Sequence, residues 1–432
     1  MPRRSKKLNE IRDMFEEHDF SIVDEEDVTV LKELRIEMGE ISDKLDSSYV
    51  RHQLGDIIMI TLLAVLSDAD EWVEIEMFGK AREKRLRRFL SLEHGIPCDD
   101  TFRTVISNLN TNYVYGIAIS FLMNKLDGIL QAALQPGEKD QGKDILSFDG
   151  KTSNGSGRKD TDVAGTAPLH TLSAYSSDNG FCVTQVFVNE KTNEITAMPE
   201  ILNSLDLRNS IATWDALNTQ KDIAEAVIKG KGDYVGALKG NHKNLYNDVA
   251  DYFEPDILAK LKNDSKKYKA TIDKEGSGVV KREYLLECDI KWLYDRDKWA
   301  GLKAIGAEVR TTTKNSPGAP SATEVRYFIS SVKDIDDFAR AVRDHWGVEN
   351  GLHWHLDFTF KDDKNTTMPK NGAKNLQTFK KLSLAILKMA QCVYPKRTSL
   401  KQLRYLLAMK FEDEIGKIFS MMNADNLILP TA

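Results

Sequence analysis

Residues 145–152 read Ile145-Leu146-Ser147-Phe148-Asp149-Gly150-Lys151-Thr152, an apolar run that ends in an aspartate. The run predicts a short buried β-strand, and the glycine after the acid permits a sharp turn of the backbone. A second run, residues 210–214, is followed by Asp215 in the same way. Because ligands bind outside the carboxyl ends of the strands in an open α/β sheet, we expect Asp149 and Asp215 to face one site.

The chain around these two aspartates alternates between strand and helix patterns. Further strands are expected at residues 169–175, 181–188 and 234–238, and helices at 197–205 and 220–229. Tight connections between the first three strands, followed by alternating strand and helix, predict a mixed sheet with an antiparallel edge. Residues 241–332 are less regular. Strand patterns at 282–288, 304–311 and 324–331 predict that this segment is a β-rich insertion.

The segment that precedes the sheet has a helical pattern. Residues 57–66 are strongly apolar but far shorter than the ~20 residues of a membrane span, so they predict a buried core helix. Polar residues with several helix breakers, 136–143, mark a linker. The expected α/β architecture has four parts: a charged helical lead-in (1–45), an all-α N-terminal domain (46–135), a catalytic domain (144–395) containing the insertion (241–332), and a C-terminal helical tail (396–432).

The composition narrows the class of protein. With 41% hydrophobic and 29% charged residues, the chain is typical of globular proteins. Its net charge of -6 gives no overall support for nucleic-acid binding, so a DNA-binding surface must be local. The four scattered cysteines form no CxxC pair, which argues against a zinc site and predicts reduced thiols in a cytoplasmic protein. Neither a secretory signal nor a membrane span is expected.

One local basic surface is expected in the helical stretch of residues 71–90. Arg82, Arg85 and Arg88 lie close together there and are candidates for contact with the DNA backbone. A charge run of this kind is equally typical of a solvated helix face, and that alternative stays open.

A glutamate that lies far along the chain completes a possible metal site. Glu349 stands in Asp344-His345-Trp346-Gly347-Val348-Glu349-Asn350, a segment with helical apolar spacing. Carboxylates on separate rigid elements can converge on a pair of Mg²⁺ ions that hold a phosphodiester. Each aspartate taken alone is also typical of a helix N-cap or a turn, and Glu349 of an ordinary surface helix. The chain has neither a P-loop nor a GxSxG nucleophile elbow.

Several motifs in this order resemble the DDE transposases of bacterial insertion sequences, in the branch that includes the H-repeat-associated proteins. The similarity extends over residues 50–387, most of the chain. It is carried by the stretches at residues 51–58, 71–76, 95–102, 149–151, 190–195, 215–220, 238–241 and 345–354. Each motif is weak alone, whereas their number and order are specific.

The resemblance implies an RNase H-like catalytic domain with the β-rich insertion before the helix that carries the glutamate. It implies that Asp149, Asp215 and Glu349 are catalytic and bind Mg²⁺, for which Mn²⁺ can substitute. The implied reaction is cleavage of DNA at the element ends, followed by strand transfer into target DNA. The protein is expected to act as a homodimer when bound to DNA and to be cytoplasmic, in association with the nucleoid. The further residues expected to contact DNA phosphates are Lys151, Lys191, Lys239 and His345.

The chain departs from the family pattern at several positions. Val342, His345 and Leu356 occupy the Tyr, Arg and Lys positions of the signature around the glutamate in related transposases. Ser277-Gly278-Val279 stands where the family often has His-Gly-Arg. Fewer cations weaken the grip on phosphates. Two alternative functions therefore stay open: an inactive or repurposed DNA-binding relic, and an RNase H-like nuclease without strand transfer.

Overall fold

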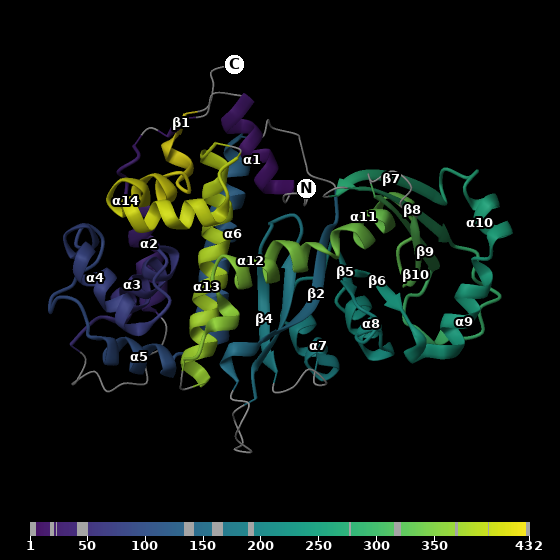
Figure 1. The fold of residues 1–432 in the computed structure, drawn as a ribbon, viewed down its shortest axis with the longest axis horizontal. Coiled ribbons are helices and arrows are strands. Elements are labelled where there is room, and N and C mark those ends of the chain that lie inside the picture. The colour runs from purple at the N-terminus through teal and green to yellow at the C-terminus, as the bar shows by residue number, and fades with distance from the viewer. Residues whose placement is uncertain are drawn as a thin grey trace.

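A helical lobe lies beside an α/β lobe in the computed structural model of the chain (Figure 1). The structure describes residues 6–17, 21–22, 24–40, 51–133, 142–157, 167–188, 194–275, 278–314, 321–367, 370–395 and 397–428. Within these residues the α/β lobe is built on one nine-stranded sheet with the order β4-β3-β2-β5-β6-β10-β9-β8-β7.

The first five strands of this sheet form its mixed half. They are β2 (Asp144–Ser153), β3 (Leu169–Ser176), β4 (Cys182–Val188), β5 (Ser210–Trp214) and β6 (Asp233–Leu238). Strands β2, β3 and β4 pair antiparallel, whereas β5 pairs parallel with both β2 and β6. This order and these directions confirm the expected RNase H-like mixed sheet with an antiparallel edge.

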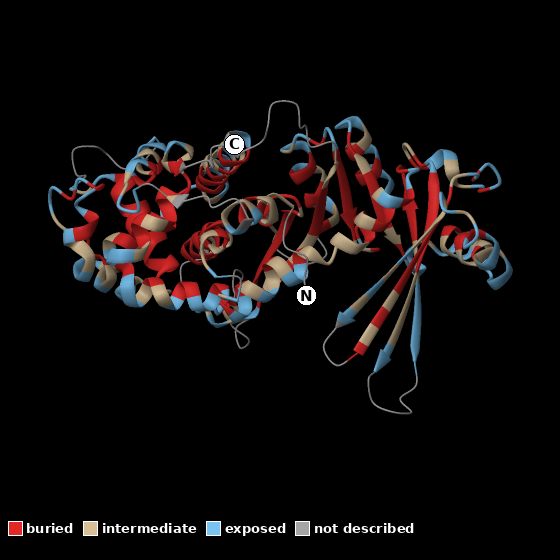
Figure 2. Ribbon diagram, turned by 90° about the horizontal axis from the view of Figure 1, so that it is seen from above, coloured by how far each residue is buried: buried red, intermediate tan, exposed pale blue. Residues whose placement is uncertain are grey.

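The insertion continues the same sheet. Its strands are β7 (Tyr268–Glu275), β8 (Gly278–Glu287), β9 (Ala304–Lys314) and β10 (Ala322–Ser330). The junction is β10, which pairs antiparallel with β6 from Tyr327 opposite Leu238 to Ser330 opposite Val235. Figure 2 shows the long strands of the insertion extending from the body with exposed ends. The sequence patterns predicted neither β7 nor the two helices of the insertion, α9 (Lys243–Tyr252) and α10 (Pro255–Leu261).

Helices cover both faces of the mixed half. Helices α7 (Glu194–Asn203) and α8 (Lys221–Lys229) share a core with one face of the sheet, built on side chains such as Trp214. On the other face, α11 (Ile335–Asp344) buries Phe338 and Val342 against apolar side chains that include Ile145. Helix α11 is strongly amphipathic, and its N-terminus is capped by the Asp334 carboxylate, which accepts from the amides of Asp336 and Asp337.

The helical lobe combines both ends of the chain. Its helices are α1 (Lys6–Glu17), α2 (Thr29–Gly39), α3 (Leu54–Leu66), α4 (Trp72–Leu86), α5 (Asp99–Asn108), α6 (Thr111–Ala133), α13 (Lys370–Ala390) and α14 (Leu400–Ser420). Every residue of α3 is buried, which confirms the predicted core helix. Side chains of α13 and α14 belong to the same hydrophobic core, and the short strands β1 (Ser21–Ile22) and β11 (Leu427–Ile428) pair.

This arrangement changes how the expected helical tail is understood. Phe411 of α14 packs edge-on against Phe78 of α4, with 5.0 Å between ring centroids. The guanidinium of Arg404 donates to the Val65 carbonyl at the end of α3. The C-terminal helix α14 thus packs into the core of the helical lobe. Among the described helices, none combines the length and the apolar character that crossing a bilayer requires.

Candidate active site

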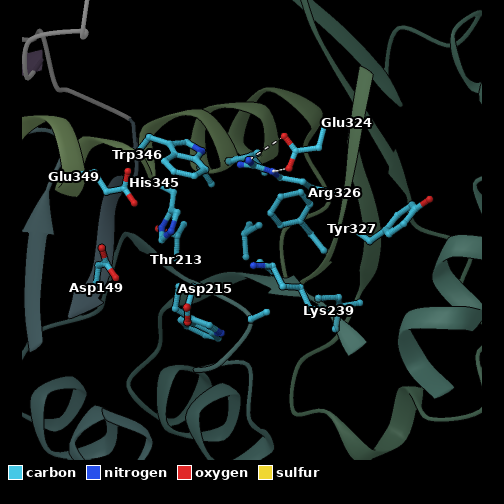
Figure 3. Close-up of a pocket in the computed structure, with 18 of the residues that line it drawn as sticks. Asp149, Thr213, Asp215, Lys239, Glu324, Arg326, Tyr327, His345, Trp346 and Glu349 are labelled. Atoms are coloured by element: carbon cyan, nitrogen blue, oxygen red, sulfur yellow. Dashed lines mark hydrogen bonds and ion pairs between the residues drawn. The ribbon is translucent and has the colours of Figure 1, made fainter. Parts of the chain in front are cut away.

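A cleft of about 770 Å³ opens where β2, β5, β6 and β10 meet α11 (Figure 3). Asp149, Asp215 and Glu349 all line it, although they are separated by up to two hundred residues in the chain. The structure therefore brings the three expected acids to one place, on three different elements.

The register of the sheet places the two aspartates beside each other. Phe148 of β2 and Trp214 of β5 are partners in the parallel ladder, and the next residue on each strand is an aspartate. Strand β5 ends at Trp214, so Asp149 has no paired neighbour on that side. The expected strand end at Asp149 is wrong, however, because β2 continues to Ser153 and stays paired with β3. Only the β2–β5 ladder stops there.

Gly150 does not form the sharp turn that the sequence suggested; it allows two other side chains to pack closely against the strand. A Cβ atom built at Gly150 would lie 2.3 Å from Oε1 of Glu194 and 2.7 Å from Nε2 of His170. Those two buried side chains pair with each other at 2.7 Å. The other oxygen of Glu194 accepts from Nδ2 of Asn218, which also contacts Asp215 at 3.3 Å. The missing side chain at position 150 thus lets a fourth carboxylate pack directly beneath the two aspartates.

The ionisation of Asp149 is opposed by its surroundings. Burial raises the pKa of Asp149 to about 7, and repulsion from Glu349, Asp215 and Glu194 adds to the shift. Oδ1 accepts a hydrogen bond of 2.9 Å from the Gly150 amide, which partly offsets it. Nδ1 of His353 lies 3.5 Å from Oδ2, but burial lowers the pKa of this imidazole to about 3, so it is neutral. A divalent cation is the group that would relieve this repulsion.

Glu349 is held on a π-helical turn (Glu349–His353) that joins α11 to α12 (Trp354–Phe358). The turn carries the i to i+5 hydrogen bond from the Trp354 amide to the Glu349 carbonyl. Such turns recur at functional sites because they redirect side chains within a helix. Burial raises the pKa of Glu349, and attraction to Arg326 opposes that shift.

A buried lysine anchors this turn. The ammonium of Lys388 on α13 donates to the carbonyl of Gly351 at 2.6 Å, to the carbonyl of Gly180 and to the hydroxyl of Tyr175 at 3.3 Å. Burial lowers the pKa of Lys388 to about 7. The lysine therefore connects the turn that bears Glu349 to the β3–β4 hairpin through acceptors that carry no charge.

Cationic and aromatic side chains form the opposite wall of the cleft. Lys239, at the end of β6, is exposed and lines the cleft as expected. Arg326 of β10 lies over the Trp346 ring, 4.7 Å from its centroid, and donates to both carboxylate oxygens of Glu324 at 3.0 and 3.2 Å (Figure 3). His345 also lines the cleft, with Nδ1 3.1 Å from the Thr213 hydroxyl, but burial lowers its pKa to about 4. It is thus a neutral hydrogen-bonding group there, not a cation.

Two of the residues expected to contact DNA are engaged in ion pairs within the protein. The ammonium of Lys151 is buried between Asp357 at 2.5 Å and Asp363 at 3.6 Å, because β2 continues past the cleft and turns this side chain toward α12. Arg85 is buried, and its guanidinium bonds the Glu26 carboxylate at 2.6 Å. Both side chains connect elements of the protein, and their contact with DNA stays a prediction.

The remaining expected DNA contacts have mixed positions. Arg88 is exposed but also pairs with Glu26, and Arg82 donates to the Ala408 carbonyl at 3.2 Å. Both remain predictions. Lys191 lies outside the described residues.

Arg326 gave no signal in the sequence, whereas Trp346 and Glu194 lie in motifs that carried the resemblance. Arg326 and Trp346 meet only because β10 pairs with β6, a contact that no local pattern encodes. Glu194 lies in one of the motifs that carried the resemblance, at residues 190–195, so its presence near a site had a signal but its position beneath Gly150 did not.

The donor set suits a magnesium ion. Mg²⁺ prefers carboxylate oxygens and usually keeps water and substrate phosphate oxygens among its ligands, bound through only one or two carboxylates. Among the described residues, no group of three or more His, Cys, Asp or Glu side chains lies close enough together to hold a metal ion. His353 lies beside Asp149, and its Nε2 atom is buried without a hydrogen-bond partner among the described residues. Such an open, carboxylate-rich site fits a metal that is completed by its substrate.

Comparison with known proteins agrees with these features. Residues 140–376 match the family described as "Transposase DDE domain", and residues 37–122 match "DDE_Tnp_1-associated". The chain is 33% identical over 350 residues to "Putative transposase YncI" of Escherichia coli O157:H7, covering 81% of this chain and 85% of that protein. It is 32% identical over 362 residues to "H repeat-associated putative transposase YhhI" of Escherichia coli K12, covering 83% and 90%.

A solved structure is also similar, although distantly. A piggyBac transposase in a synaptic complex with hairpin DNA has a TM-score of 0.36 and 13% identity, covering 94% of this chain and 80% of that one. The family assignment depends on the sequence matches, which span most of the chain. This protein belongs to the DDE transposase family, with the family's associated domain ahead of its DDE domain.

Proposed function

We propose that this protein is an insertion-sequence transposase that cleaves DNA at the ends of its element and transfers the freed strand into target DNA. The observation that carries the proposal is the convergence of Asp149, Asp215 and Glu349 on one cleft. Membership of the transposase family supports it. The assembly that acts on DNA is proposed to be a homodimer.

The three carboxylates would hold Mg²⁺ or Mn²⁺. When bound, the metal would lower the pKa of an attacking water or 3′-hydroxyl and neutralise charge on the phosphate oxygens. The raised pKa of Asp149 fits this purpose, because a neighbouring cation would favour the ionised carboxylate that burial disfavours. In-line displacement then requires mainly positioning and charge neutralisation from the protein.

The other residues of the cleft would bind and orient the DNA strand. Lys239 offers an exposed ammonium to a phosphate at the end of β6. His345, being neutral and bonded to Thr213, offers a directed hydrogen bond. Glu194 would act through its bond to Asn218 by keeping that amide against Asp215.

The test is an incubation of the full chain with the genomic DNA that flanks its gene, with Mg²⁺ or Mn²⁺. We expect a nick at a defined position, and joining of pre-cut ends to a target plasmid. D149A should reduce both reactions by at least a hundredfold, because the acid cannot be replaced by a methyl group. The matched control is D222A, which removes an exposed carboxylate on α8, outside the lining of the cleft. Nicking by D149A at the wild-type rate would refute the proposal.

A second candidate function is an inactive DNA-binding relic. The observation that favours it is that two residues expected to contact DNA, Lys151 and Arg85, are both engaged in internal ion pairs. DNA binding without any metal-dependent nick would support the relic. Nicking without joining of pre-cut ends would instead support a nuclease that lacks strand transfer.

A further inference from the structure

Exposed aromatic rings lie directly beyond the turn that carries Glu349. Trp354 and Phe358 on α12 are each 51% exposed, and Tyr405 on α14 is 64% exposed. The rings of Trp354 and Phe358 stack, with 4.6 Å between centroids and 21° between planes. The ammonium of Lys401 lies 4.9 Å from the Phe358 ring centroid. We name these four side chains, Trp354, Phe358, Lys401 and Tyr405, the aromatic strip.

Continuity with the cleft places the aromatic strip next to the catalytic acids. The hydrogen bond from the Trp354 amide to the Glu349 carbonyl closes the π-helical turn, so Trp354 directly follows the turn that carries Glu349. Trp354 is not part of the cleft lining, whereas His353 before it is. The aromatic strip therefore begins where the cleft ends.

The side chains of the aromatic strip are typical of a surface that binds nucleobases. Exposed flat rings bind the faces of nucleobases at about 1–3 kcal/mol per base, and every base offers such a face. Lys401 adds a cation for the phosphate backbone, and Tyr405 lies one turn further along the same face of α14. The nearest acid of α12, Asp357, is neutralised by the ammonium of Lys151 at 2.5 Å. A stable protein partner would require about 800 Å² of each surface, far more than three rings present.

We propose that the aromatic strip binds unpaired bases of the DNA strand whose phosphate occupies the cleft. The ligand class is single-stranded DNA adjacent to the cleaved position. The inference rests on the proposed function, because a cleavage reaction that opens the duplex beside the reacting phosphate exposes the faces of the bases. Duplex DNA keeps its bases stacked upon one another and gives the rings nothing to bind.

The experiment measures the affinity of the full chain for a fluorescein-labelled 16-nucleotide oligo-dT, by anisotropy in EDTA. The absence of metal prevents any cleavage. W354A should bind this oligonucleotide about tenfold more weakly, and binding to a duplex of the same length should change less than about twofold. W354F should retain most of the affinity, since a phenyl ring also stacks. The difference between W354A and wild type should persist as salt is raised, because stacking releases no counterions.

The matched control is W292A. Trp292 is 46% exposed and stacks on Tyr252, with 5.1 Å between centroids, but it lies in the insertion, far from the π turn in the sequence. W292A should bind oligo-dT as the wild type does. Unchanged circular dichroism and thermal midpoint would show that W354A is folded. Equal affinity of W354A and wild type, or equal losses for W354A and W292A, would overturn the proposal.

Other outcomes separate this proposal from neighbouring ones. A change of W354A from dimer to monomer in sedimentation, with oligo-dT affinity retained, would mean that a second copy of the chain covers the aromatic strip, and the proposal would fail. Binding of oligo-dT that depends on Trp354, combined with no nicking in Mg²⁺, would support the stacking surface and reject the proposed catalytic function. Nicking in Mg²⁺, combined with oligo-dT binding that does not depend on Trp354, would support the proposed catalytic function and reject the stacking surface.

Discussion

At the scale of single residues, the ionisation of Asp149 links the cleft to stability. Its folded-state pKa of about 7 lies above the ordinary value of 3.8, so the folded protein holds this proton more tightly than the unfolded chain does. Stability that depends on the protonated form is present at low pH and is lost as the pH rises through the interval from about 4 to about 7.

We therefore expect D149N to be more stable than the wild type at pH 8 in EDTA, by on the order of 1–3 kcal/mol, since it removes the charge repulsion. The difference should vanish near pH 4. Urea denaturation at the two pH values measures it. D222N, which changes an exposed carboxylate on α8, should show no such pH-dependent difference. Equal stability of D149N and wild type at pH 8 would contradict the electrostatic account of the cleft.

The close packing at Gly150 leads to a second prediction. G150A should destabilise the protein by about 1–3 kcal/mol, because the new methyl group overlaps Glu194 and His170. It should also lower the cleavage rate, since Glu194 supports Asn218 beside Asp215. Thermal denaturation and a nicking assay measure the two effects. The control is G240A, where a Cβ atom meets nothing within 4 Å. A fully active and stable G150A would show that the packing beneath the aspartates is not required.

At the scale of secondary-structure elements, the π turn and its lysine form one unit. The Lys388 ammonium donates to the carbonyls of Gly351 and Gly180, and a side chain without donors would remove both hydrogen bonds. We expect the π turn to relax and to move Glu349. Lys388 would thus affect the cleft from another helix, although it does not line the cleft itself. Lys388 is in this sense a positioning residue.

We expect K388M to lower the cleavage rate about tenfold or more, because shifts of about 1 Å in a catalytic group reduce rates strongly. The affinity for DNA should change little. Single-turnover kinetics and anisotropy separate these two quantities. K374M is the matched control on the same helix, since the Lys374 ammonium lies over the Phe187 ring rather than against the turn. A parallel loss of DNA affinity and rate in K388M would indicate general misfolding instead.

At the scale of the whole molecule, the helical lobe is closed by both ends of the chain. Phe411 of α14 is fully buried and contacts Phe78 of α4, more than three hundred residues earlier. We expect F411A to reduce the free energy of unfolding by about 3–5 kcal/mol, as for other buried phenylalanines. M409A, which changes a side chain 63% exposed on the same helix, should have an effect within about 0.5 kcal/mol. Chemical denaturation measures both. A small effect of F411A would mean that α14 contributes little to the packing of the helical lobe.

The sequence by itself determined where most strands lie, and it predicted the three acids that line one cleft. Alternation and apolar runs depend on neighbouring residues, so the strands at Asp149, Asp215 and along the first part of the sheet were readable from local patterns. Ordered motifs also identified the family, because they depend only on residue types and spacing.

Only the tertiary structure decided how these parts meet. The parallel register of Phe148 with Trp214 sets the aspartates side by side, and the pairing of β10 with β6 delivers Arg326 to the cleft. The structure also turned Lys151 and Arg85 inward and joined α14 to the first helices. Such contacts depend on residues far apart in the chain, and their energies come from burial and pairing that no local pattern contains.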